Sequence, residues 1–321
     1  ITLIDMEGVS LSAGIDKNGQ AIWFAPSSIS DDENFKFTQF LKNGNIIGYG
    51  NGIGYEIKLN GDIIFETPIG IDTHHDFNKS ANNTYFLIGQ DIQYQYCPIE
   101  CNPNLPDEIL WKGDVYREFN KNGTEIWNWN TFDHIDLSEY NPYYVETFSG
   151  FHQMDWTHSN SIFFDPNSNS VYVSIRNMSR ITKINYETKE IIWNMGEADY
   201  LNNVSFSEDL NFSQQHSVQV LDNGNILFFD NHRYLDPEIS RCIEVAYDEN
   251  NWTSEIVWEH QLPQELFTGS RGECDRLENG NTLITAGRSG YIQEVNESGD
   301  IIWQLFLQNM GTRVGMYRST R

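Results

Sequence analysis

Short apolar segments with a period of two run along the chain, and turn-like sequences separate them. The clearest case is residues 214–231, where two such segments flank Asp222-Asn223-Gly224-Asn225. A turn sequence of this kind supplies positive φ at low steric cost, so the pattern predicts a β-hairpin. A histidine, His216, stands at the start of this hairpin.

The hairpin pattern recurs with variations in residues 36–48, 75–89, 158–174 and 272–286. Aligned on the asparagine of the turn, one position at the start of the first strand is occupied by Lys36, His75, His216 and Gly272, and His158 holds it ahead of a longer turn. One position in a repeat therefore carries histidine three times. That coincidence is the main functional signal in the sequence.

A second repeat consists of a turn followed by a strand that ends in an aromatic residue. The aromatic residues are Trp23, Phe65, Trp127, Trp193, Trp258 and Trp303. Propeller blades repeat at about 40 to 50 residues, and longer intervals imply insertions. The longer intervals here place insertions at about 90–112, 131–157 and 197–213.

Together the two repeats predict an all-β fold, a six-bladed β-propeller of four-stranded blades that forms a single domain over residues 1–321. The first blade is incomplete, because the chain begins only shortly before Trp23. We expect residues 315–320 to supply the missing strand. The C-terminal strand would then close the ring and remove two exposed sheet edges.

The first strand of each propeller blade lines the central channel, so residues at its start face the axis near one mouth. We therefore expect His75, His158 and His216 to converge. Arg176, just past the second strand of its hairpin, joins them as the fourth candidate catalytic residue.

Three further residues are candidates for substrate binding. Lys36 holds the repeated position in its blade, and His74 stands beside His75 but would alternate to the other face of a strand. Asn160 should share a strand face with His158, given the period of two. The remaining histidines follow no repeat and are interpreted as structural: His134, His152, His232 and His260.

The formal net charge of −26, from 46 acidic and 20 basic residues, argues against sequence-independent binding to nucleic acid or anionic lipid. No apolar segment approaches the roughly 18 residues of a membrane span, and the N-terminus lacks the layout of a signal peptide. The sequence therefore predicts neither nucleic acid nor membrane as a partner.

The chain has four cysteines, an even number that permits disulfides without requiring them. Cys97 and Cys101 lie in a proline-rich insertion, where we expect a local disulfide, which would imply an oxidising compartment. Their spacing matches no metal-binding pattern, and we expect no metal site. The sequence leaves the redox state of Cys242 and Cys274 open.

Several phrases of the sequence resemble the bacterial arylsulfate sulfotransferase family over nearly the whole chain. They are Thr157-His158-Ser159-Asn160, Ser174-Ile175-Arg176-Asn177, Gln215-His216-Ser217-Val218, Asp222-Asn223-Gly224-Asn225 and Met316-Tyr317-Arg318. Members of this family are similar in being six-bladed propellers that move a sulfuryl group from one phenol to another. The resemblance implies an aryl sulfate donor, a phenolic acceptor and no nucleotide cofactor.

Carried over by motif, the transiently sulfated histidine of the family falls on His216, and its sulfate-binding partners fall on His75, His158, Asn160 and Arg176. The resemblance also implies a periplasmic or secreted location. Nothing before Trp23 is long enough for the N-terminal β-sandwich that helps well-known members to dimerise, so the sequence indicates no oligomeric state.

The chemistry of the residues fits sulfuryl transfer independently. In-line displacement at a sulfate ester needs a nucleophile, donors for the non-bridging oxygens and an acid for the departing phenolate. Imidazoles and a guanidinium supply all three. Two alternatives stay open: a propeller polysaccharide lyase that acts on an anionic glycan, and a non-catalytic propeller that binds an anionic ligand.

Overall fold

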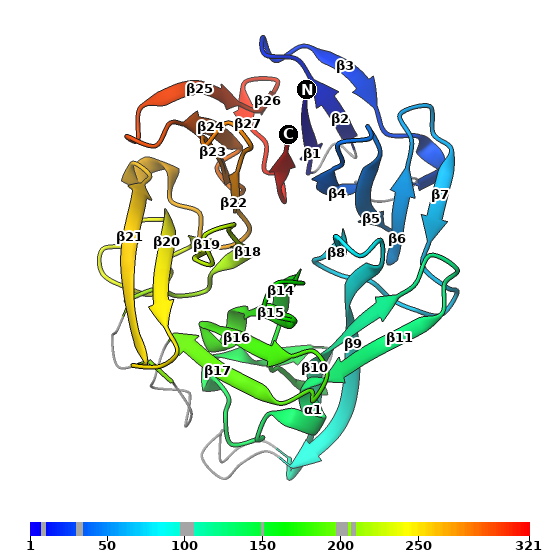
Figure 1. Cartoon of the computed structure of the whole chain (residues 1–321), viewed down its shortest axis with the longest axis vertical. Helices are drawn as coiled ribbons and strands as arrows, with labels where there is room; N and C mark the ends of the chain where they lie inside the picture. Colours follow the sequence, from blue (N-terminus) through cyan, green and yellow to red (C-terminus); the bar gives the residue numbers. More distant parts are fainter. Residues whose placement is uncertain (8–10, 30–34, 97–105, 149–150, 197–204, 207–209) are drawn as a thin grey trace.

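Six antiparallel sheets stand in a ring around a common axis in the computed structural model of this chain (Figure 1). The structure describes residues 1–7, 11–29, 35–96, 106–148, 151–196, 205–206 and 210–321. Each sheet forms one blade, with its first strand nearest the axis. The predicted six-bladed β-propeller is therefore confirmed.

The first three blades each contain four strands in order from the axis outwards. Blade one consists of β28 (Ser319–Thr320), β1 (Thr2–Met6), β2 (Leu11–Ile15) and β3 (Ala21–Phe24). Blade two consists of β4 (Lys36–Phe40), β5 (Ile46–Gly50), β6 (Ile53–Ile57) and β7 (Ile63–Glu66). Blade three consists of β8 (Phe77–Lys79), β9 (Tyr85–Tyr96), β10 (Glu108–Phe119) and β11 (Glu125–Asn130).

The other three blades follow the same order. Blade four consists of β14 (Ser159–Asp165), β15 (Ser170–Ile175), β16 (Arg180–Asn185) and β17 (Ile191–Gly196). Blade five consists of β18 (His216–Val220), β19 (Ile226–Asp230), β20 (Arg241–Asp248) and β21 (Thr253–Gln261). Blade six consists of β22 (Glu273–Arg276), β23 (Thr282–Ala286), β24 (Tyr291–Val295) and β25 (Ile301–Phe306).

The insertions at about 90–112 and 131–157 enlarge blade three. Its strands β9 and β10 continue beyond the blade as a long hairpin, and β13 pairs with β10 in parallel while β12 pairs with β13. The remaining elements are short: η1 (Ser27–Ile29), α1 (Thr131–His134), η2 (Pro142–Tyr144), β12 (Val145–Phe148), β13 (Phe151–Asp155), η3 (Arg176–Met178), η4 (Gln264–Leu266), β26 (Gln308–Asn309) and β27 (Thr312–Arg313).

Within the described residues, six clusters of buried apolar side chains hold the ring together, and each lies between two neighbouring blades. One of them, for example, packs Phe86 and Trp111 of blade three against Ile162 and Val171 of blade four. Each blade thus buries both of its faces against its neighbours. Stability then depends on an unbroken ring.

The repeated aromatic residue of the outer strand ties each blade to the next one. Trp303 Nε1 donates to Lys17 O, in the turn between the third and fourth strands of the next blade, at 2.7 Å. The other tryptophans bond to the same turn: Trp23 to Leu59 O, Trp127 to Tyr186 O, Trp193 to Glu249 Oε1 and Trp258 to Glu297 O. Phe65 has no N–H and stacks on Tyr85 of the next blade, with ring centroids 3.8 Å apart.

The C-terminal strand closes the ring, as predicted, although only Ser319–Thr320 of the expected residues 315–320 form the strand. It pairs antiparallel with β1, so that the first and last segments of the chain share blade one (Figure 1). Just before β28, the backbone N–H groups of Tyr317 and Arg318 donate to the carboxylate of Asp5 at 3.0 and 3.2 Å. Burial raises the pKa of Asp5 to about 6, although both of these hydrogen bonds act to lower it.

A disulfide between Cys242 on β20 and Cys274 on β22 links blades five and six, with the Cα atoms 5.9 Å apart. This pairing answers what the sequence leaves open for these two cysteines. Cys97 and Cys101, for which the sequence predicts a local disulfide, lie outside the described residues.

Reducing the disulfide is expected to lower the free energy of unfolding by about 3 to 4 kcal/mol, because its cysteines are 32 residues apart and the cross-link restricts the unfolded chain. Denaturant unfolding with and without a reductant measures the change. In the Cys242→Ala/Cys274→Ala double variant, the reductant should change the free energy of unfolding only by the contribution of Cys97 and Cys101. An equal response of the parent and the double variant would contradict the prediction.

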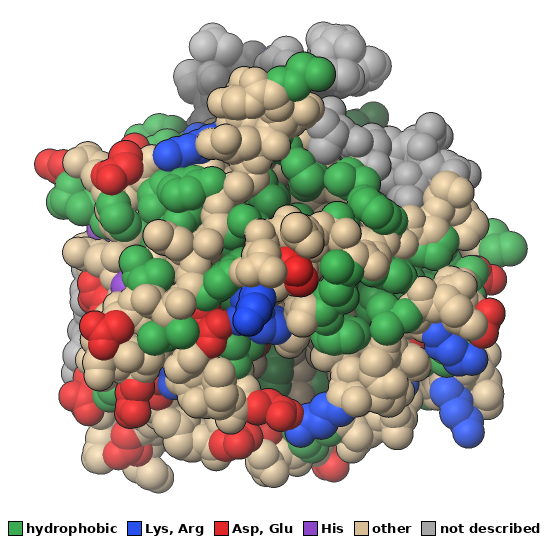
Figure 2. Space-filling model, turned by 90° about the horizontal axis from the view of Figure 1, so that it is seen from above, with side chains coloured by type: hydrophobic (Ala, Val, Ile, Leu, Met, Phe, Trp, Pro, Cys, Tyr) green, Lys and Arg blue, Asp and Glu red, His purple; other side chains and the backbone are tan. Residues whose placement is uncertain are grey.

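Acidic side chains are dispersed over the rim of the ring beside β3 and β25, where Figure 2 shows them among apolar, uncharged and some basic ones. Several apolar residues of these outer strands are exposed, including Ile22, Phe24, Ile301 and Ile302.

In the part of the chain that the structure describes, no helix is both long and apolar enough to cross a membrane.

Candidate active site

Residues at or just before the starts of the innermost strands line a cavity of about 660 Å³. Lys36 and His216 are the first residues of β4 and β18, and His75, His158 and Tyr317 precede β8, β14 and β28. Blade six contributes Arg271, just ahead of β22. The full lining is Glu7, Lys36, Tyr49, Asn51, Gly52, Asp72, Thr73, His74, His75, His158, Arg176, His216, Ser270, Arg271, Arg288 and Tyr317. Residues at the repeated position of different blades therefore line the same cavity.

Six of the seven site residues predicted from the sequence line this cavity: Lys36, His74, His75, His158, Arg176 and His216. The sequence predicts that His74 alternates away from His75. Both residues precede β8 and are not part of a strand, so the period of two does not apply, and both rings reach the cavity.

Asn160 is the exception. It is fully buried, its Nδ2 donates to Gln215 O at 2.7 Å, and it is absent from the cavity lining. The shared face with His158 is not formed, because His158 has a left-handed backbone (φ 49°) and a register irregularity follows between Ser159 and Ser161. A role for Asn160 in substrate binding stays a prediction.

The hydrogen bonds of His216 determine which ring nitrogen carries a proton. Its Nδ1 lies 2.6 Å from Asn231 Oδ1 and 3.0 Å from Gln214 O, and both oxygens are acceptors. Asn231 Nδ2 donates to Thr268 O and Arg271 O, which fixes its Oδ1 towards the imidazole. Nδ1 is therefore protonated, and the lone pair is on Nε2.

Nε2 accepts a hydrogen bond of 3.1 Å from the backbone N–H of Arg271. Burial, and next the positive charge of Arg176, hold the pKa of His216 well below its ordinary value. His216 is thus a neutral imidazole with an oriented lone pair at neutral pH. This is the state that a nitrogen nucleophile requires.

The rings of His74, His75 and His158 form a row beside His216. The ring centroids of His75 and His158 are 4.7 Å apart, and those of His74 and His75 are 4.9 Å apart. Burial, followed by the charges of its histidine neighbours, holds the pKa of His75 well below its usual range. His158 Nδ1 lies 2.6 Å from the carboxylate of Asp155, which fixes Nδ1 as the protonated nitrogen.

Arg176 is the buried cation of the site. It starts η3, where its Nη1 donates to Asn177 Oδ1 at 2.8 Å and its guanidinium lies 5.8 Å from the centre of the Tyr144 ring. Its buried Nε has no hydrogen-bond partner within the described residues. Because a buried guanidinium N–H is costly to leave unsatisfied, this arrangement favours an anionic ligand.

Four lining residues other than glycine have left-handed backbones: Asn51 (φ 51°), His75 (φ 60°), His158 (φ 49°) and Arg271 (φ 65°). Such conformations cost energy in residues with a Cβ and cluster at functional sites. The lining also carries four Lys or Arg residues against two acidic ones, in a chain of net charge −26. The cavity is therefore suited to an anion.

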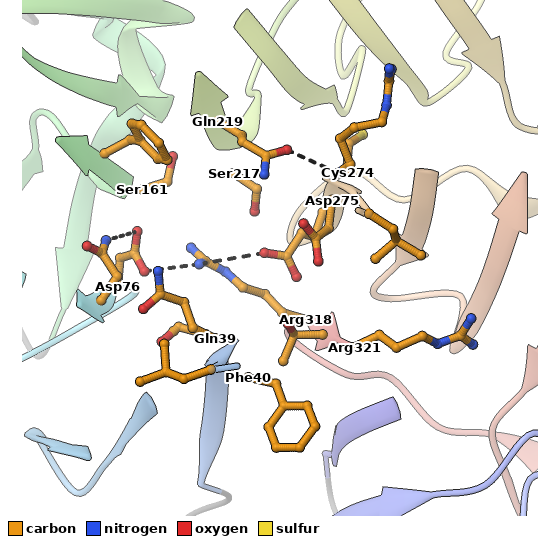
Figure 3. A pocket seen from close by; sticks show the side chains of 18 of the residues that line it. Gln39, Phe40, Asp76, Ser161, Ser217, Gln219, Cys274, Asp275, Arg318 and Arg321 are labelled. Atoms are coloured by element: carbon orange, nitrogen blue, oxygen red, sulfur yellow. Dashed lines mark hydrogen bonds and ion pairs between the residues drawn. The ribbon is translucent and has the colours of Figure 1, made fainter. Parts of the chain in front are cut away.

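A second cavity, of about 600 Å³, lies beyond the pair of Arg318 and Asp76 (Figure 3). Arg318 Nη1 bonds to Asp76 Oδ1 at 3.0 Å and its Nη2 to Asn160 O at 2.5 Å. The residues that precede this pair in sequence, Tyr317 and His75, line the first cavity instead. The ion pair therefore forms part of the partition between the two cavities.

Sequence reasoning missed the residues that hold the imidazoles, namely Asn231, Asp155 and Asp114. A usable signal exists for Asn231, because it directly follows the second strand of its blade, as do Asn51 and Arg176. Asp155 and Asp114 belong to the enlarged blade three and follow no repeat. Among the described residues, no group of three or more His, Cys, Asp or Glu is arranged to hold a metal ion.

A family model described as Arylsulfotransferase (ASST) matches residues 3–311. A protein of unknown function from Bacteroides caccae is similar over 99% of this chain and 97% of its own, with a TM-score of 0.59 and 14% identity, which shows the fold alone. Virginiamycin B lyase from Staphylococcus aureus aligns over 87% of this chain and 71% of its own, with 13% identity and a TM-score of 0.45, too distant to support an argument. No curated protein matches the chain significantly.

Proposed function

This chain belongs to the arylsulfotransferase family, and we propose that it transfers a sulfuryl group from a phenolic sulfate ester to a phenol through a covalent sulfohistidine at His216. The observation that carries the proposal is the state of His216. Its imidazole lines a cavity rich in cations, is neutral and protonated on Nδ1, and carries on Nε2 a lone pair that accepts from the Arg271 N–H.

In the first half-reaction, His216 Nε2 attacks the sulfur atom while the bond from sulfur to the phenol oxygen breaks. The sulfur atom takes the place of the Arg271 N–H, which donates to Nε2 in the structure. Arg176 binds the non-bridging oxygens together with His158 in its imidazolium form, in which Nδ1 donates to Asp155 and Nε2 donates to a sulfate oxygen. A neighbouring histidine protonates the leaving phenolate. Asn231 keeps its hydrogen bond to Nδ1 and stabilises the charge that develops on the imidazole.

In the second half-reaction, a phenol acceptor occupies the place that the first phenol has left. Its oxygen attacks the sulfur atom, the bond between sulfur and Nε2 breaks, and a histidine accepts the phenolic proton. Because the sulfuryl group resides on the protein between the two steps, the kinetics should be ping-pong.

Arg176→Ala is expected to lower kcat/KM for an aryl sulfate on the order of 10²- to 10³-fold, as for removal of a donor that stabilises the transition state. The charge of Arg176 also lowers the pKa of His216, so its removal raises that pKa and moves the acidic limb of the pH–rate profile to higher pH. Arg176→Lys is the matched variant. It keeps the charge, so the acidic limb should stay near its parental position. A rate for Arg176→Ala within a few-fold of the parent would refute the role.

A transfer assay tests the proposed function itself. We expect release of a nitrophenol from its sulfate ester to depend on an added phenol, with one sulfated acceptor formed per nitrophenol released. Release of unsaturated uronides from an anionic glycan would instead identify a lyase. Saturable binding of the sulfate ester without either reaction would identify a binding protein.

The proposed location is the periplasm or the extracellular space. The disulfide between Cys242 and Cys274 supports it, because such bonds persist mainly in oxidising compartments.

A further inference from the structure

Two imidazoles share one short contact beside the proposed nucleophile. His74 Nδ1 and His75 Nδ1 are 2.7 Å apart, which is a hydrogen-bond distance between two nitrogens. Only one of them can carry the hydrogen atom. The other ring nitrogen of His74, Nε2, lies 3.3 Å from Asp114 Oδ1, so the three side chains form a chain from a carboxylate to the cavity.

The surroundings place the proton of the shared contact on His74. Burial alone would lower the pKa of His74, but the Asp114 carboxylate at 3.3 Å, aided by the backbone of Gly89 and by the charge of Asp72, raises it above the ordinary value. The groups that face His75 are His74, His158, His216, Tyr317 and Arg318, and the burial of His75 and the positive charge around it lower its pKa strongly. His75 is thus neutral, accepts at Nδ1 and carries its own proton on Nε2.

Two members of this chain of side chains, Asp114 and His74, are held in place by further hydrogen bonds. Asp114 Oδ2 accepts hydrogen bonds from Ser159 N at 2.7 Å and from Thr157 Oγ1 at 2.5 Å, and it is almost fully buried. The backbone N–H of His74 donates to Ile88 O at 2.9 Å. His74 therefore has a fixed position between the carboxylate and His75.

We propose that His75 is the acid that protonates the leaving phenolate, and that His74, held by Asp114, is a positioning residue that returns a proton to His75 as the acid acts. This proposal rests on the proposed sulfuryl transfer. It identifies the histidine that protonates the leaving group and the residue from which that histidine regains a proton.

The proton balance closes in each half-reaction. As the S–O bond breaks, its electron pair goes to the phenol oxygen, the His75 Nε2 proton goes to the same oxygen, and the His74 Nδ1 proton moves to His75 Nδ1. His216 Nε2 has meanwhile formed the S–N bond. His74 is now neutral, and His75 presents a free lone pair on Nε2.

In that state His75 is the base that the second half-reaction needs. It takes the proton of the acceptor phenol on Nε2 as the S–O bond to the acceptor forms and the S–N bond breaks. The proton on His75 Nδ1 returns to His74 Nδ1, and the starting state is restored. No proton has to enter or leave the cavity during a turnover.

The experiment compares donors with good and poor leaving groups in the His74→Gln variant, because a glutamine amide still donates a hydrogen bond but cannot transfer a proton. We expect kcat with phenyl sulfate to fall on the order of 10²-fold, the lower end for general acid catalysis, and kcat with a dinitrophenyl sulfate to change less than about threefold. In the parent, the rate with phenyl sulfate should fall as the pH rises through the pKa of His74, and the variant should lose this alkaline limb. His134→Gln, at an exposed histidine outside the cavity lining, is the matched control and should behave as the parent.

An equal loss of rate with both donors, with the alkaline limb retained, would overturn the relay and leave His74 a structural role. If His74→Gln does not fold, nitrogen NMR of the parent decides: a His74 imidazolium beside a His75 protonated on Nε2 supports the relay, and a neutral His74 refutes it. Failure of the parent to form a sulfated His216 would count against the proposed function instead, so the two failures are distinguishable.

Discussion

Replacing His216 with asparagine is expected to abolish sulfuryl transfer while the protein stays folded. Asparagine fills much of the space of the imidazole and can still donate to the buried oxygen of Asn231, but it has no nucleophilic nitrogen. Loss of a covalent nucleophile lowers kcat on the order of 10⁴- to 10⁶-fold. Transfer from a nitrophenyl sulfate to phenol measures this loss directly.

The matched control is His260→Asn, because His260 lies outside the cavity lining and its Nε2 bonds to Gln293 instead. It should retain parental activity. Thermal melting of both variants separates loss of chemistry from loss of fold. Transfer by His216→Asn at near the parental rate would show that His216 is not the nucleophile, and a lyase or binding role would become the better interpretation.

Removing residues 314–321 is expected to cost most of the stability of the fold. The truncation deletes β28, leaves β1 with an open edge, and removes Arg318 from between two buried carboxyl groups, Asp76 and Glu273. Taking one partner from a buried ion pair alone costs about 3 to 5 kcal/mol, and a typical domain has only about 5 to 15 kcal/mol in total. Denaturant unfolding and hydrogen exchange at β1 measure the effect.

A chain that lacks only Arg321 is the control, since this truncation leaves β28 and Arg318 in place. It should unfold close to the parent. Adding a peptide of residues 314–321 to the longer truncation should restore part of the stability, because the peptide can re-form the missing strand. Identical melting of the truncated and full chains would contradict closure of the ring by the C-terminus.

Much of the fold could be predicted from the sequence because the repeats have direct physical causes. The Asn-Gly turns recur because every hairpin needs a positive φ, which Gly44, Gly224 and Gly280 supply. The tryptophans of the outer strand recur because each one donates a hydrogen bond into the next blade, as Trp303 does to Lys17. Contacts that repeat from blade to blade leave a period in the sequence.

The site could be predicted only in part, for the same reason. His75, His158 and His216 share a repeated position, so their convergence follows from the symmetry of the ring. The partners that set their protonation do not repeat. Asp114 meets His74 because the segment before β8 leaves strand geometry, and no spacing in the sequence records that departure.

The sequence likewise does not predict the disulfide or the ion pair that separates the two cavities. Cys242 and Cys274 pair because neighbouring blades bring β20 and β22 together, with the Cα atoms 5.9 Å apart, and the spacing of the cysteines in the sequence does not encode this proximity. Arg318 lies in a phrase that carries the family resemblance, yet its ion pair with Asp76 depends on the residues that the closed ring brings together.

The covalent intermediate is the central claim, and rapid quench of the protein with an aryl sulfate alone tests it most directly. With no acceptor present, we expect a burst of one phenol per protein molecule and a mass increase of one sulfuryl group on the peptide that contains His216. The modification should disappear when a phenol is added, with formation of the sulfated acceptor. Turnover with donor and acceptor together, but without any sulfated His216 under donor alone, would contradict the account.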